Sequence, residues 1–98
     1  MARKKVIWST RAKLEFYSIL EYFLERNGSN TYSLKLLDEI EKLTDDLALN
    51  PSLGRLTTDR SSRVIPHKDY LIFYQISDLF IEILSVWDNR QNDQNLNL

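Results

Sequence analysis

With 98 residues, 43% hydrophobic and 28% charged, the chain has the size and composition of one globular domain and not of a disordered protein. The lack of cysteine excludes a disulfide framework and a thiolate metal site, and one histidine gives no basis for a zinc site. A net charge of −1 argues against broad coating of nucleic acid, and no uncharged run approaches the roughly 20 apolar residues of a membrane span. We therefore expect a cytoplasmic protein that needs neither metal nor cofactor.

The N-terminal half predicts a strand followed by two helices. The apolar, β-branched run at residues 5–9 predicts the strand, and Ser9 or Thr10 can cap the helix that follows. Asn27-Gly28 ends this first helix, and Asn50-Pro51 ends the second, so the two helices should form an antiparallel hairpin. Their apolar stripes are Ala12, Phe16, Ile19, Leu20 and Phe23 on the first helix and Leu36, Leu37, Ile40, Leu43 and Leu47 on the second.

The C-terminal half predicts a small antiparallel sheet after a turn and a polar loop at residues 51–62. Residues 63–65 predict a short strand that Pro66 should halt, which places it at a sheet edge or bend, and two longer apolar runs then predict a β-hairpin. With Ser77-Asp78 as the turn residues, the predicted cross-strand pairs are Ile76 with Leu79, Tyr74 with Ile81, Ile72 with Ile83, and Leu71 with Leu84. The expected fold class is therefore α+β: an N-terminal strand, an antiparallel helical hairpin, and a three-strand antiparallel meander in one small sheet.

The two faces of the predicted hairpin have different compositions. Because side chains alternate across a strand, one face gathers apolar residues for the core: Tyr70, Ile72, Tyr74, Ile76, Leu79, Ile81 and Ile83. The other face carries a second apolar group, which two helices on the opposite side would leave open: Leu71, Phe73, Leu84 and Val86. We expect a partner protein to cover this group, because monomers seldom expose so large an apolar patch. The alternative is that a helix or the N-terminal segment folds over it.

Basic residues near the sheet suggest one possible chemistry. Metal-free cleavage of RNA needs a base, a cation for the charged phosphorane and an acid for the leaving oxygen. Arg63 and Arg90 could hold the phosphate, since a guanidinium binds two phosphate oxygens, and His67 could transfer a proton near neutral pH. The alternatives are an ion pair between Arg90 and Asp88, and an exposed loop position for His67.

Several short motifs, in this order and spacing, resemble the RelE/ParE superfamily, whose members are toxins of type II toxin–antitoxin modules. The resemblance covers residues 4–92, within a domain that we expect at residues 1–92, before a flexible tail at 93–98. The motifs are Val6-Ile-Trp-Ser-Thr-Arg-Ala12 with Leu14-Glu15, Ile40-x-x-Leu43 through Asn50-Pro51-x-x-Gly54, Arg63 ahead of Tyr70-Leu-Ile-Phe-Tyr-Gln-Ile76, and Ile83-Leu-Ser-Val-Trp-Asp-Asn-Arg90. The resemblance implies the α+β fold described above and a small antitoxin that wraps the toxin and suppresses growth inhibition.

Departures from the superfamily's nuclease branch favour its other branch. A RelE-like toxin, which cleaves mRNA on the ribosome, carries arginine directly after the tyrosine that begins the third strand, where this chain has Leu71. No Tyr, His, Lys or Arg follows Arg90. We therefore expect a ParE-like inhibitor of DNA gyrase and not an enzyme. The alternatives are a ribosome-dependent endoribonuclease using Arg63, His67 and Arg90, and a degenerate module that binds its antitoxin without toxicity.

Overall fold

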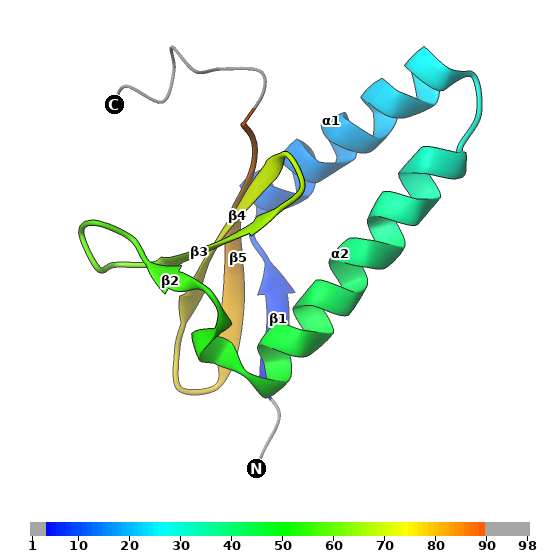
Figure 1. Ribbon diagram of the computed structural model, residues 1–98. Coiled ribbons are helices and arrows are strands. Elements are labelled where there is room, and N and C mark those ends of the chain that lie inside the picture. The colour runs from blue at the N-terminus through cyan, green and yellow to red at the C-terminus, as the bar shows by residue number, and fades with distance from the viewer. Residues whose placement is uncertain (1–3, 90–98) are drawn as a thin grey trace.

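The computed structural model of the protein describes residues 4–89, which form two helices and a five-stranded sheet (Figure 1). Arg90 and the predicted tail at residues 93–98 lie outside the described residues. The elements in chain order are β1 (Lys5–Trp8), α1 (Thr10–Asn27), α2 (Thr31–Leu49), the 3-10 helix η1 (Pro51–Leu53), β2 (Arg55–Leu56), β3 (Arg63–His67), β4 (Tyr70–Ile76) and β5 (Phe80–Asp88).

Local sequence chemistry sets the ends of α1, as expected. Ser9 is its N-cap, and the Ser9 hydroxyl accepts a hydrogen bond from the Ala12 N–H at 3.0 Å. Gly28 ends the helix with φ of 67°, in the left-handed region that glycine adopts without a steric penalty. Helix α2 begins after Asn30, whose side chain makes no cap hydrogen bond. The two helices are joined by a hydrogen bond from the Ser33 hydroxyl to the Leu20 carbonyl at 2.7 Å.

The sheet confirms the α+β class but contains more strands than the predicted meander. Its order is β1-β5-β4-β3-β2, and β1 pairs with β5 in parallel while the other neighbours are antiparallel. Strand β3 also passes through Pro66 to His67, so the prediction that Pro66 halts it is wrong. Strand β2 pairs only with Arg63 and Val64, so β3 has no neighbour on that side at Pro66. The strand can therefore continue through proline, because the backbone N–H that proline lacks would have no partner there.

The predicted register of the β4–β5 hairpin is wrong by two residues at the turn. Ile76 pairs with Ile81 and Tyr74 with Ile83, because the turn spans residues 77–80 and is closed by a hydrogen bond from the Ser77 N–H to the Phe80 carbonyl. Further along, a β-bulge separates the pair Tyr74–Ile83 from the pair Phe73–Ser85, leaving Leu84 without a counterpart. A bulge of one residue reverses which face each following side chain occupies.

The helices pack against one face of the sheet, and the core lies between them. Apolar residues of α1 and α2 meet Tyr70, Ile72, Tyr74, Ile81 and Ile83 of the sheet, as predicted. Two other predicted core residues are wrong, since the longer turn leaves Ile76 and Leu79 exposed. Val86 is also misplaced in the prediction: the bulge turns it into the core, where it is only 3% exposed, and removes it from the open face.

Candidate functional site

Arg63 stabilises the turn that precedes β2. Its Nη1 donates to the Gly54 carbonyl at 2.6 Å. The Tyr74 hydroxyl accepts from the Gly54 N–H and donates to the Pro51 carbonyl, both at 2.7 Å. Burial raises the pKa of Tyr74, which keeps this hydroxyl a neutral donor. The arginine is therefore part of a network that fixes the backbone of residues 51–54.

His67 lies at the other end of β3 from Arg63. Four residues of strand separate the two by about 13 Å at ~3.3 Å per residue. The His67 Nε2 lies 3.0 Å from Glu39 Oε1 of α2, and Lys68 Nζ donates to the same carboxylate at 3.0 Å. Hydrogen bonds from His67 and then Lys68 lower the pKa of Glu39. Of the predicted nuclease residues, the structure thus keeps Arg63 and His67 apart, each with its own partner, and Arg90 is not among the described residues.

The face of the sheet away from the helices carries three of the four predicted partner-binding residues. Leu71, Phe73 and Leu84 are each half-buried there. Leu71 and Phe73 also line a hollow of about 220 Å³, whose floor includes Val64 and whose rim is formed by residues 55–58. The sequence predicted the apolar floor of this surface but not its rim. Strand β2, which begins the rim, is only two residues long, too short to leave an alternating pattern in the sequence.

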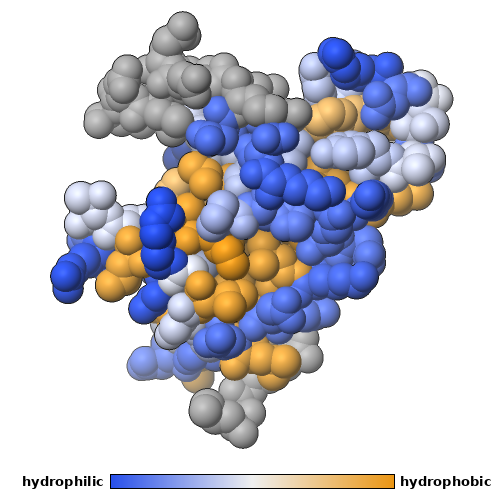
Figure 2. Space-filling view, in the orientation of Figure 1, coloured by the Kyte–Doolittle hydropathy of each residue, from blue (hydrophilic) through white to orange (hydrophobic). Residues whose placement is uncertain are grey.

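A second apolar area lies on the helix side of the molecule. Figure 2 shows apolar side chains gathered at the surface between α2 and the sheet, beside a band of hydrophilic residues along α2. Ile65 of β3, which packs against the core, is only half-buried. The helical hairpin therefore does not cover the whole of its face of the sheet.

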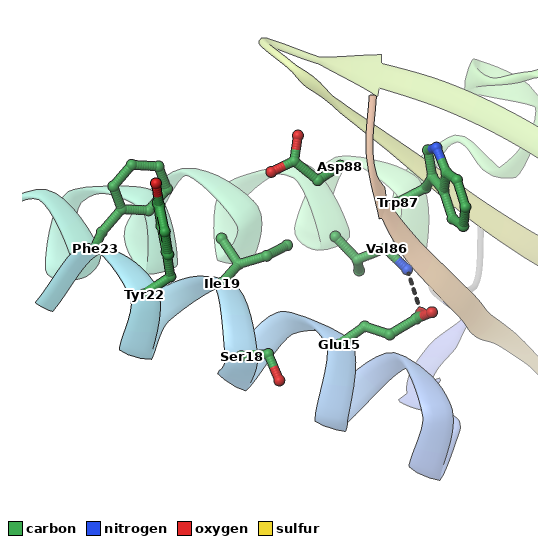
Figure 3. A pocket seen from close by; sticks show the side chains of 8 residues that line it. All are labelled: Glu15, Ser18, Ile19, Tyr22, Phe23, Val86, Trp87 and Asp88. Carbon is green, nitrogen blue, oxygen red and sulfur yellow. Dashed lines mark hydrogen bonds between the residues drawn. The ribbon is translucent and has the colours of Figure 1, made fainter. Parts of the chain in front are cut away.

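Figure 3 shows a groove between α1 and β5 that no sequence pattern predicted. It has a volume of about 230 Å³ and is lined by Glu15, Ser18, Ile19, Tyr22, Phe23, Val86, Trp87 and Asp88. Strand β1 pairs with β5 only as far as Ile83, so α1 takes its place beside the rest of β5. The Glu15 carboxylate accepts from the Ser85 hydroxyl at 2.8 Å and from the Val86 N–H at 3.1 Å.

Glu15 thus satisfies a backbone donor next to the bulge and fixes the distance between α1 and β5. Its position directly after Leu14 was part of the motif that suggested the superfamily, but no local pattern indicates a contact 70 residues away. The groove is a product of tertiary packing.

These features define a small α+β protein with a helical hairpin on a mixed sheet and an apolar surface on either side. The same fold occurs in a chain of the chromosomal ParDE TA system from P. aeruginosa, with a TM-score of 0.75 and 17% identity over 88% of this chain and 96% of that one. No curated protein matches the sequence.

The model of one protein family, described as the ParE toxin of type II toxin-antitoxin system, parDE, matches residues 6–93. The chain belongs to this family, and it is a ParE-like toxin with an antitoxin as its partner. Within residues 4–89, neither helix is long and apolar enough to cross a membrane.

Proposed function

We propose that this toxin arrests growth in the cytoplasm by inhibiting DNA gyrase. Membership of the ParE family supports a gyrase target. The observation that favours gyrase inhibition over RNA cleavage is the separation of Arg63 from His67 on β3. Metal-free cleavage needs a base and a phosphate-binding cation around one phosphate. Here the guanidinium is hydrogen-bonded to the Gly54 carbonyl, and the imidazole is paired with Glu39.

The target is tested with the purified full chain, gyrase, ATP and relaxed plasmid. We expect loss of supercoiling and accumulation of cleaved plasmid, and, after induction in cells, double-strand breaks with an SOS response. Transcripts cut at codon boundaries, with gyrase unaffected, would instead support the endoribonuclease, and Arg63→Ala would then abolish the cleavage. Normal growth after induction would leave only the degenerate binding module.

We further propose that the antitoxin binds the face of the sheet that carries Leu71, Phe73 and Leu84. Half-buried apolar side chains around a hollow of about 220 Å³ suit an apolar anchor residue from a partner. The exposed polar residues on its rim, Arg55 and Thr58, resemble the solvated edge that surrounds such anchors in interfaces.

A matched pair of substitutions tests this face. Leu71→Asp places a carboxylate in the proposed contact and should weaken antitoxin binding by at least about thirtyfold, the effect of losing a central anchor. Leu14→Asp makes the same change at an α1 residue that is 61% exposed, and it should leave binding unchanged. Titration calorimetry with the antitoxin from the adjacent reading frame measures both, and thermal unfolding checks that both variants are folded. Equal affinities of the two folded variants would contradict the proposal.

A further inference from the structure

The loop between β2 and β3 is held in one conformation by its own hydrogen bonds. The Thr57 N–H donates to the Ser62 carbonyl, and the Arg60 N–H donates to the Thr57 carbonyl, both at 2.9 Å. The Asp59 carboxylate accepts from the Thr57 hydroxyl at 2.8 Å, and from the Ser61 N–H and hydroxyl at 3.0 and 2.8 Å. These bonds, those from Ser61 and Thr57 first, lower the pKa of Asp59 to about 2, so the loop keeps them throughout the physiological pH range.

Arg60 occupies the one position of this loop that favours glycine. Its φ is 62°, in the left-handed region where a Cβ is unfavourable and where hairpin loops usually carry glycine or asparagine. The side chain is exposed, and nothing in the fold of the loop requires a guanidinium. A residue that strains the backbone at an exposed tip indicates a role for its side chain.

Next to this tip is a hollow of about 200 Å³ that we call the arginine hollow. Its polar lining consists of Arg60, Ser61, Ser62, Arg63 and Gln75, with Leu56 and Ile76 as its apolar part. The two guanidinium groups, the Ser62 hydroxyl and the Gln75 amide can donate hydrogen bonds into the hollow, whereas the Ser61 hydroxyl already donates to the Asp59 carboxylate at 2.8 Å. No carboxylate is among these described lining residues. The hydrogen bond from Arg63 Nη1 to Gly54 holds one guanidinium in place, and Gln75 Nε2 is tied to the Ser61 carbonyl at 3.2 Å.

We propose that the arginine hollow binds a phosphate of a nucleic-acid backbone. Two guanidinium groups beside the Ser62 hydroxyl match the oxygens of a phosphodiester, and a guanidinium can bond two of them at once. The hollow is shallow and lies at the edge of the sheet, which suits one phosphate of a polymer. A focused site of this kind is compatible with the net charge of −1, which argues against wide electrostatic binding.

The nucleic acid is duplex DNA, and this part of the inference rests on the proposed action on gyrase, whose substrate is duplex DNA. The hollow differs from a nuclease site because its lining contains no histidine or carboxylate to act as a base. It would hold DNA without cutting it.

The test measures binding of the full chain to a short fluorescein-labelled DNA duplex by anisotropy at several salt concentrations, without gyrase. Arg60→Gly removes the guanidinium and also relieves the left-handed strain, so the variant should unfold at the same temperature as the parent or a higher one. We expect its affinity for the duplex to fall about tenfold, and the salt dependence of log K to become less steep by about 1.

A charge-matched pair controls for net charge. Arg60→Gln should weaken duplex binding as Arg60→Gly does, whereas Arg26→Gln, at an exposed arginine in the last turn of α1, should not. Inorganic phosphate should displace the labelled duplex from the parent chain, and it should have no such effect on the residual binding of the duplex to Arg60→Gly. The proposal is overturned if the parent chain does not bind the duplex, or if Arg60→Gly and Arg26→Gln lose equal affinity.

Single-stranded RNA of the same sequence tests whether the bound phosphate belongs to duplex DNA or to RNA. Tighter binding of RNA than of duplex would overturn the assignment to DNA. The anisotropy assay contains no gyrase and is therefore independent of the supercoiling assay. If Arg60→Gly binds the duplex as tightly as the parent, the phosphate site is refuted, even if the supercoiling assay shows that the toxin inhibits gyrase. Conversely, failure to inhibit gyrase refutes the proposed function even if duplex binding depends on Arg60.

Discussion

Gly54→Ala should unfold the toxin at much lower denaturant concentration, although it adds only one methyl group. A Cβ at this position would lie 2.8 Å from both the Tyr74 Cε1 and hydroxyl and 2.9 Å from the Val64 carbonyl. The backbone of β3 cannot yield easily, so the Tyr74 ring must move. Tyr74 is fully buried, and its movement breaks the hydrogen bonds to Gly54 and Pro51.

The magnitude follows from these two effects. Overpacking in a core costs about 1–3 kcal/mol, and a buried polar group left unpaired costs about 1–3 kcal/mol. We expect the free energy of unfolding to fall by about 3 kcal/mol, which lowers the urea midpoint by about 2 M at a typical slope of ~1.5 kcal/mol per molar. Tryptophan fluorescence during urea unfolding measures the midpoint, with Ser52→Ala, at an exposed position of η1, as the control.

A double-mutant cycle identifies the cause. Tyr74→Phe removes the hydroxyl and should itself cost about 2 kcal/mol, because the Gly54 N–H and the Pro51 carbonyl lose their partner. Adding Gly54→Ala to Tyr74→Phe should then cost less than Gly54→Ala alone, since one of the close contacts has been removed. A loss below about 1 kcal/mol for Gly54→Ala, or strict additivity in the cycle, would refute this account of the turn.

Two further predictions concern Asp59 and the bulge. The pKa of Asp59 is about 2 in the folded protein against an ordinary value of 3.8, so its stabilising effect is complete above pH 3.8 and is lost as the pH falls through about 2. Asp59→Ala should therefore lower the unfolding temperature at neutral pH, and the difference from the parent should shrink in that acid range; a difference independent of pH would contradict the role of the carboxylate. Val86→Ala should cost about 2 kcal/mol, because Val86 is in the core, while Leu84→Ala at the bulge should cost less than about 1 kcal/mol. Urea unfolding compares the two, and the reverse order would place the bulge elsewhere.

The parts of this fold that could be predicted are those fixed by local chemistry. Ser9, Gly28 and Pro51 mark helix ends because a hydroxyl cap, a left-handed residue and a missing N–H act within one turn of the chain. The alternation of β4 likewise placed Tyr70 and Ile72 in the core. Each of these features depends on residues that are close together in the sequence.

The remaining features depend on contacts between distant residues. The pairing of β1 with β5 joins Lys5 to Phe80, and no local pattern selects a parallel partner so far along the chain. The β4–β5 turn contains no glycine, so nothing in its sequence distinguishes a turn of two residues from the observed span of 77–80. No local pattern in the sequence indicates the bulge at Leu84 either. Val86 follows the bulge in β5 and was therefore placed on the wrong face, whereas Leu71 and Phe73 belong to β4 and were placed correctly by simple alternation.

The role of Arg63 shows why a basic residue near a sheet edge does not by itself indicate a nuclease. A guanidinium held by a backbone carbonyl at 2.6 Å loses little conformational freedom when a phosphate arrives, which favours binding. Catalysis would require a base and an acid at the same phosphate, and the His67 imidazole is paired with Glu39 about 13 Å along the strand at ~3.3 Å per residue. The nearest second guanidinium that lines the same hollow is Arg60, which adds charge but no proton transfer. The geometry of β2 and β3 therefore suits a toxin that holds a nucleic acid in place while leaving its backbone intact.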